Sequence, residues 1–225
     1  MPLTLLKRIL ITALAAGFIA GLFMSAIQAR WVIPLIEQAE AYEFCTPDLE
    51  CPPGAALKDA MPVERLGYTA LFNILSGVAF GLLLTAGYAL RGEPISWKQG
   101  IVWGLAGFAA FSLAPALGLP PAPPGSTHMP LQESQLWWLA CAAATAAGLA
   151  LLAFGNRRFK LLGVAAMILP HAVGAPLPIG DNTVPAEVVV EFITASLVTT
   201  GLFWLALGGL SGFVYCRLSA ANGPD

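Results

Sequence analysis

Charge is what this sequence has least of. Only 11% of its 225 residues are Asp, Glu, Lys or Arg, whereas 57% are hydrophobic and the mean hydropathy is +0.75. Soluble domains carry about 25% charged residues, so this chain cannot cover a water-facing surface. The net charge of -2 argues against binding to nucleic acid. We therefore expect an integral membrane protein whose surroundings are the lipid bilayer.

Motifs that mark soluble enzymes and nucleotide-binding proteins are missing as well. The sequence has no Gly-rich phosphate loop, no CxxC pair and no GxSxG, and it has no stretch long enough to form a soluble catalytic domain. These absences predict a protein that is not an enzyme and that has no tightly bound cofactor. Without a nucleotide motif, any energy that the protein uses would come from a partner, from the membrane potential or from an ion gradient.

Long apolar stretches recur along the chain, and each approaches the roughly 20 residues that cross the hydrocarbon layer. They predict an all-α fold, a polytopic transmembrane helix bundle of about six spans in a single integral membrane domain, residues 1–225. The expected spans are 9–29, 67–90, 100–117, 136–154, 161–178 and one within 187–215. The pairs Gly17/Gly21 and Gly77/Gly81 have the small-xxx-small spacing that lets helices approach closely. Asn73 is expected to hydrogen-bond to a neighbouring helix.

The fifth span is expected to be short or broken. Its clean apolar run, residues 161–169, reaches bilayer length only by including Pro170 through Pro178. We expect the helix to break at Pro170, and such backbone is tolerated at membrane depth only inside protein or beside a water-filled cavity. The segment is therefore predicted to be buried in the bundle or to line a cavity, with His171 at the break.

Residues 30–66 form a polar, acidic connection that holds two of the four cysteines. In an oxidising compartment Cys45 and Cys51 would close a small disulfide loop. A thiolate metal pair is the alternative, but it needs further ligands and no histidine is near. Cys141, inside the fourth span, is expected to be buried and unreactive.

The lysines and arginines sort by side when six crossings start from a cytoplasmic N-terminus. Eight of the eleven then lie inside: Lys7, Arg8, Arg91, Lys98, Arg157, Arg158, Lys160 and Arg217. This positive-inside pattern predicts a multi-pass protein of the inner (plasma) membrane with both termini cytoplasmic. It also places residues 30–66 outside, in agreement with a disulfide.

The same orientation gathers the candidate metal ligands near the outer face. They are His171, Glu191, Asp181, His128 and Glu187. Imidazole and carboxylate groups near a broken helix suit transient binding of a divalent cation. Other interpretations stay open: His171 as a hydrogen-bonded residue at a helix end, His128 as a solvated loop residue, and Glu187 as a helix cap.

The sequence resembles the CbtA family of bacterial membrane proteins. The likeness rests on LWW at 136–138, PHAVGAP at 170–176 and VPAEVVVEFITASL at 184–197, and it covers most of the chain. Where many relatives carry an LPPELPG-like run, residues 119–125 read LPPAPPG. The missing carboxylate puts a metal role for that loop in doubt.

The resemblance implies a subunit of a proposed cobalt uptake system linked to cobalamin synthesis, with Co²⁺ as the transported ion. It also implies a small histidine-rich partner, a CbtB-like membrane subunit, and assembly as a homo-oligomer is a further expectation. One alternative is a membrane scaffold or assembly partner, with glycine faces that bind another subunit and no metal path of its own. An intramembrane hydrolase using His171 and Glu191 is a second alternative, and it lacks an activated nucleophile.

Overall fold

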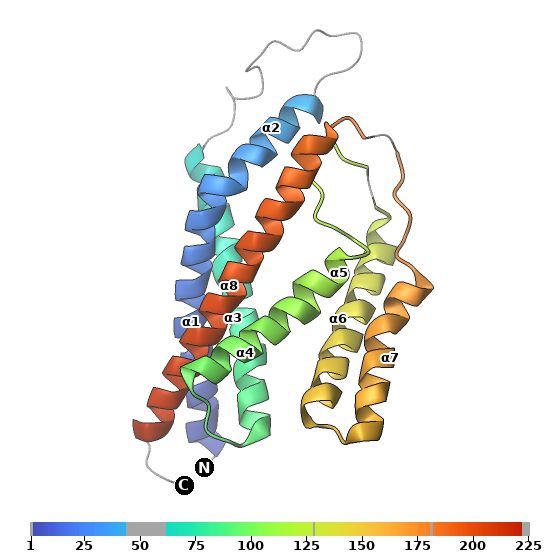
Figure 1. Ribbon diagram of the computed structural model, residues 1–225. Helices are drawn as coiled ribbons and strands as arrows, with labels where there is room; N and C mark the ends of the chain where they lie inside the picture. The colour runs from blue at the N-terminus through green and yellow to red at the C-terminus, as the bar shows by residue number, and fades with distance from the viewer. Residues whose placement is uncertain (1, 44–61, 128, 181, 222–225) are drawn as a thin grey trace, which may run out of the picture. The chain divides into compact units, whose positions relative to one another are not determined.

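A computed structural model describes residues 2–43, 62–127, 129–180 and 182–221, and the elements in these ranges are helices (Figure 1). They are α1 (Pro2–Trp31), α2 (Ile33–Glu43), α3 (Pro62–Arg91), α4 (Trp97–Phe108), the π-helix η2 (Ala109–Leu113), α5 (Ala114–Ala116), α6 (Leu131–Phe154), α7 (Arg157–Val173) and α8 (Ala186–Ala221). The predicted all-α, polytopic membrane fold is confirmed.

Five helical stretches in the described part of the chain are long and apolar enough to cross a membrane. They are Thr4–Trp31, Val63–Arg91, Trp97–Ala116, Leu131–Phe154 and Ala186–Ala220. The predicted fifth span corresponds to α7, which has 17 residues and a length of about 25 Å. It is a little shorter than the hydrocarbon layer, a mismatch that a bilayer accommodates by local thinning.

The chain divides into two compact units. Unit 1 comprises residues 1–30, 61–107 and 198–225, and unit 2 comprises residues 31–60 and 108–197. This division does not test the expectation that residues 1–225 form a single integral membrane domain, which stays a prediction.

Glycines hold the helices of unit 1 together by backbone contact. Gly17 of α1 lies against Gly77 of α3, and Gly21 lies against the backbone of Asn73 and Ile74 one turn away. Close approach of this kind replaces the hydrophobic effect, which does not act between helices in lipid. The two small-xxx-small pairs that the sequence pointed to therefore face each other within this chain.

Asn73 adds a polar contact at the same α1–α3 junction. Its Nδ2 donates hydrogen bonds to Ser25 Oγ at 3.0 Å and to Gln28 Oε1 at 2.6 Å, both on α1. The expectation that Asn73 hydrogen-bonds to a neighbouring helix is confirmed.

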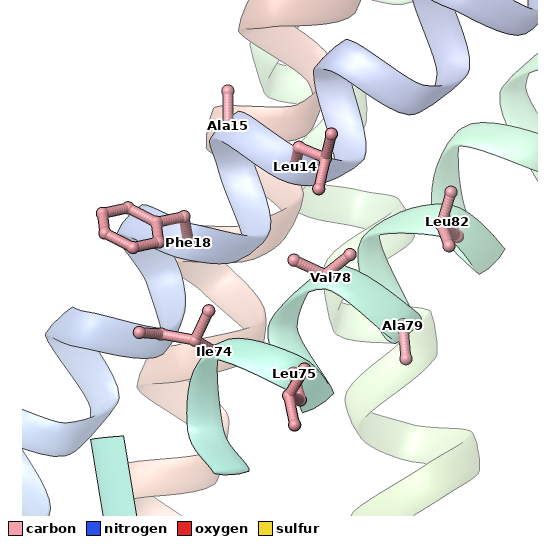
Figure 2. Close-up of a pocket in the computed structure, with 8 residues that line it drawn as sticks. All are labelled: Leu14, Ala15, Phe18, Ile74, Leu75, Val78, Ala79 and Leu82. Atoms are coloured by element: carbon pink, nitrogen blue, oxygen red, sulfur yellow. The ribbon is translucent and has the colours of Figure 1, made fainter. Parts of the chain in front are cut away.

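The outer surface of α1 and α3 is apolar. Leu14 and Phe18 of α1 and Ile74, Val78 and Leu82 of α3 line a shallow groove without polar side chains (Figure 2). Such a groove suits acyl chains, because a lipid tail needs no hydrogen bonds from the helix surface.

The start of α1 and the end of α8 lie side by side in unit 1. The Arg8 guanidinium donates to Ser219 Oγ and to Tyr215 Oη, each at 3.0 Å, and stacks 4.4 Å from the Tyr215 ring centroid. Tyr215 packs edge-on against Tyr88 of α3, whose hydroxyl shares a 3.0 Å hydrogen bond with Ser211. The first and last helices therefore meet at their terminal ends.

In unit 2, α2 occupies part of the connection that was predicted to be a loop. Val32 and Leu35 pack on Phe192 of α8, and Ala39 packs on Val184 and Val188. These residues recur at helical spacing, so 33–43 form a helix rather than a loop, and the polar connection is shorter than expected. Cys45 and Cys51 lie outside the described residues, and their disulfide stays a prediction.

Candidate metal-binding site

Helices α6 and α7 form a tight antiparallel hairpin in unit 2. Asn156 caps α7, because its Oδ1 accepts hydrogen bonds from the backbone N–H groups of Arg158 and Phe159. Gly148 of α6 and Gly163 of α7 are both buried, and a Cβ on either glycine would collide with the carbonyl oxygen of the other. The two helix backbones are therefore in contact midway along the hairpin.

Pro170 does not break α7, and that sequence prediction was wrong. The helix continues through Pro170 to Val173 and ends at Gly174, which has a φ of 93°. A proline in the last turn removes only one helical hydrogen bond. Glycine tolerates the positive φ that follows, and its N–H still reaches the Pro170 carbonyl at 3.1 Å.

His171 follows Pro170 and is held against α6. Its Nε2 lies 3.7 Å from Cys141 Sγ, and its ring meets that of Trp137 edge to face, with centroids 5.7 Å apart. Trp137 Nε1 in turn donates to the carbonyl oxygen of Pro170 at 3.2 Å. The indole thus fixes the backbone next to His171 and covers one side of its imidazole.

Burial differs among these side chains. Cys141 is fully buried and Trp137 is 9% exposed, whereas His171 is half-buried in the last turn of α7. The prediction that Cys141 is buried is confirmed. An imidazole at this position contacts protein on one side and remains accessible on the other, so an ion could reach it.

Of the predicted carboxylate ligands, the structure describes Glu187 and Glu191. Glu187 and Glu191 lie one turn apart on α8 and are exposed. His128 and Asp181 lie outside the described residues. Among the residues that are described, no group of three or more His, Cys, Asp and Glu side chains is placed to hold a metal ion.

Sequence reasoning missed the contact between His171 and Cys141. The signal was present, because Trp137, Cys141 and Thr145 recur at intervals of four and share one face of α6. What the spacing does not give is the register of α7 against that face. The Gly148–Gly163 contact fixes that register, and those glycines were not among the predicted packing pairs.

Compared with known protein families, residues 6–216 match the family described as "Probable cobalt transporter subunit (CbtA)". No curated protein and no solved structure matches the chain.

Proposed function

The chain belongs to the CbtA family of probable cobalt transporter subunits, and on that premise we propose that it carries Co²⁺ into the cell for cobalamin synthesis, past His171. The observation that carries the proposal is the placement of His171 at the end of α7. There Trp137 and Cys141 hold the imidazole half-buried within 3.7 Å of a second donor atom. Membership of a transporter subunit family also implies that the protein is not an enzyme.

The contact between Arg8 and Tyr215 supports an even number of crossings. Five crossings would leave the start of α1 and the end of α8 on opposite sides of the bilayer, yet these ends hydrogen-bond. Counting α7 as the sixth crossing removes the conflict. In unit 2, Thr183 before α8 donates to the carbonyl of Gly125 before α6 at 2.9 Å, which puts both connections at one end.

This topology favours the predicted orientation with both termini in the cytoplasm. The α6–α7 turn then faces inward with Arg157, Arg158 and Lys160, as the positive-inside rule requires. His171, at the opposite end of α7, faces the outside. The predicted disulfide between Cys45 and Cys51 belongs to the same outer side.

A cation would first meet the exposed acidic groups at this side. Glu187 and Glu191 attract cations without enclosing them, and His128 and Asp181 are further candidates on neighbouring connections. Weak, stepwise binding suits transport, because the ion must also leave. Nickel, copper and zinc compete with cobalt for nitrogen and oxygen donors, so this set alone does not select cobalt.

The word subunit in the family description implies a partner. We propose a small histidine-rich membrane protein of the CbtB type, which would pass the ion to His171 from outside. The alternative function, a scaffold with no metal path, required glycine faces free to bind another subunit. The faces of α1 and α3 are instead used within this chain, which weighs against that form of the scaffold hypothesis.

Uptake of radiolabelled Co²⁺ tests the proposal, in cells that lack their own cobalt importer. The cells express the wild type or His171→Ala at matched membrane levels, each with and without the small partner. Uptake that requires the chain and falls in His171→Ala supports the proposal. Uptake indifferent to His171 contradicts the proposed entrance, and no uptake in any pairing favours the scaffold.

A further inference from the structure

We propose that Cys141 and His171 together bind the transported ion, Cys141 as a thiolate. We also propose that the interface between α6 and α7, here called the seam, continues the ion's path from this pair. The inference rests on the proposed function and deepens it. It assigns a role to a cysteine that the sequence pattern marked as inert, and it narrows the class of ion that the site accepts.

The spacing of the two donor atoms fits a shared ion. A four-coordinate zinc ion has bonds of about 2.3 Å to thiolate sulfur and about 2.0 Å to imidazole nitrogen, which places those atoms about 3.5 Å apart at a tetrahedral angle. Cobalt(II) is close to zinc in size. The separation of 3.7 Å between Cys141 Sγ and His171 Nε2 therefore needs almost no movement for both atoms to bind one cation.

Further donor atoms follow the pair into the seam. Thr145 lies one turn after Cys141 on the same face of α6 and is 1% exposed, and its hydroxyl lies next to the Cys141 thiol. Threonines elsewhere in these helices bond back to the carbonyl four residues earlier, as Thr85 does to Gly81 and Thr194 to Val190. Thr145 instead presents its oxygen to Cys141, the first of the proposed ligands.

Met167 adds a second sulfur at the next level. It precedes His171 by one turn of α7, and its Sδ lies 3.1 Å from the position that a Cβ on Gly148 would take. The absence of a side chain at Gly148 therefore leaves room for the thioether at the helix contact. Nitrogen, thiol sulfur, hydroxyl oxygen and thioether sulfur thus follow one another between two antiparallel helices.

This donor set defines the substrate class. Binding to Cys141 as a thiolate releases the thiol proton to water, and only transition-metal ions bind sulfur tightly enough to displace it. Magnesium and calcium prefer carboxylate, carbonyl and water oxygens. We infer that the seam accepts cobalt-like divalent ions and rejects these abundant hard cations, a selectivity that the exposed carboxylates cannot provide.

The test uses the full-length chain purified in detergent, titrated with cobalt chloride alone under anaerobic conditions. Cys45, Cys51 and Cys216 are replaced by serine so that Cys141 is the remaining thiol. The expected result is a near-ultraviolet sulfur-to-cobalt charge-transfer band that saturates at one ion per chain and persists in excess magnesium. His171→Ala should weaken binding at least tenfold, or about 1.4 kcal/mol.

Restoring Cys216 is the matched control, because this exposed thiol should leave the band unchanged. Loss of the band in Cys141→Ser, with the protein still eluting as the same detergent-bound species, supports the inference. Protection of Cys141 from a maleimide by cobalt is a second measurement that does not depend on any Cys141 variant. No band and no protection overturn the inference.

Failure of the inference and failure of the proposed function give different results. Cobalt uptake that survives Cys141→Ser, with no charge-transfer band in the single-cysteine chain, rejects the ligand but keeps the transporter. A charge-transfer band at one ion per chain, without cobalt uptake either with or without the small partner, supports Cys141 as a ligand and rejects transport.

Discussion

Gly208 of α8 lies so close to Gly100 of α4 that a Cβ on either residue would overlap the carbonyl oxygen of the other. Gly104 and Gly212 continue this contact by one turn on either side. Buried in unit 1, the four glycines let α4 and α8 pack backbone to backbone. The α1–α3 pair uses the same device, so both junctions depend on the absence of side chains rather than on large apolar ones.

The first prediction follows from this contact. Gly208→Ala should destabilise the protein by about 1–3 kcal/mol, the usual cost of overpacking, because a methyl group there meets backbone that cannot rotate away. Gly209→Ala is the matched control on the same helix, since its Cβ would meet the Ile101 side chain at ordinary distances, 3.4 Å from Cγ1 and 3.9 Å from Cδ1. Melting temperatures in detergent compare the two, and equal losses would contradict the packing argument.

Asn73 carries the second prediction. Asn73→Leu removes the hydrogen bonds to Ser25 and Gln28 and should lower stability by about 0.6 to 2 kcal/mol, the range for hydrogen bonds between membrane helices. Combining it with Gln28→Leu should cost less than the sum of the two single substitutions, because the residues share one interaction. Strictly additive losses in a double-mutant cycle would show that the contact contributes nothing.

The third prediction concerns topology. With six crossings, a fluorescent protein fused after Asp225 should fluoresce in the cytoplasm, and alkaline phosphatase fused there should be inactive. The same phosphatase inserted after Gly180 should be active, because that connection is predicted to be outside. An active C-terminal phosphatase would remove α7 from the count of crossings and reverse the assignment of α8.

The contact of Arg8 with the end of α8 makes the fourth prediction. Arg8→Ala loses two hydrogen bonds and a cation–π contact, so the end of α8 should become more accessible to protease. Lys7→Ala removes the same charge from the next residue, which is exposed, and serves as the control. Limited proteolysis in membranes measures the difference, and similar cleavage in both variants would show that the Arg8 contacts do not hold the end of α8.

The sequence predicted the fold well because spans are set by length and hydropathy. Bilayer thickness imposes both on each helix separately, so no knowledge of neighbours is needed. The helical interval 33–43 was missed because its apolar residues are interleaved with glutamates and lie beside a proline-rich stretch. Its burial is visible only once Phe192 and Val188 of α8, with Val184 just before that helix, form a packing surface.

The candidate site was predicted in part for a related reason. His171 stood out by residue type and by its proline and glycine neighbours, which are local features. Its partner Cys141 lies 30 positions away, and the register of α7 on α6 depends on the contact of Gly148 with Gly163. The expected break at Pro170 failed because a proline near a helix end removes a single hydrogen bond that the final turn can do without.

Trp137 gives the last prediction, which separates positioning of His171 from general stability. Trp137→Phe keeps a ring beside His171 but loses the hydrogen bond to the Pro170 carbonyl, and groups that orient a ligand usually change metal affinity by about tenfold. The cobalt concentration for half-maximal uptake should therefore rise about tenfold, while the maximal rate should change little. Trp138→Phe is the matched control, since Trp138 packs on Phe111 instead and should leave both values unchanged. A fall in the maximal rate alone, or equal effects of the two variants, would mean that Trp137 stabilises the hairpin without orienting the imidazole.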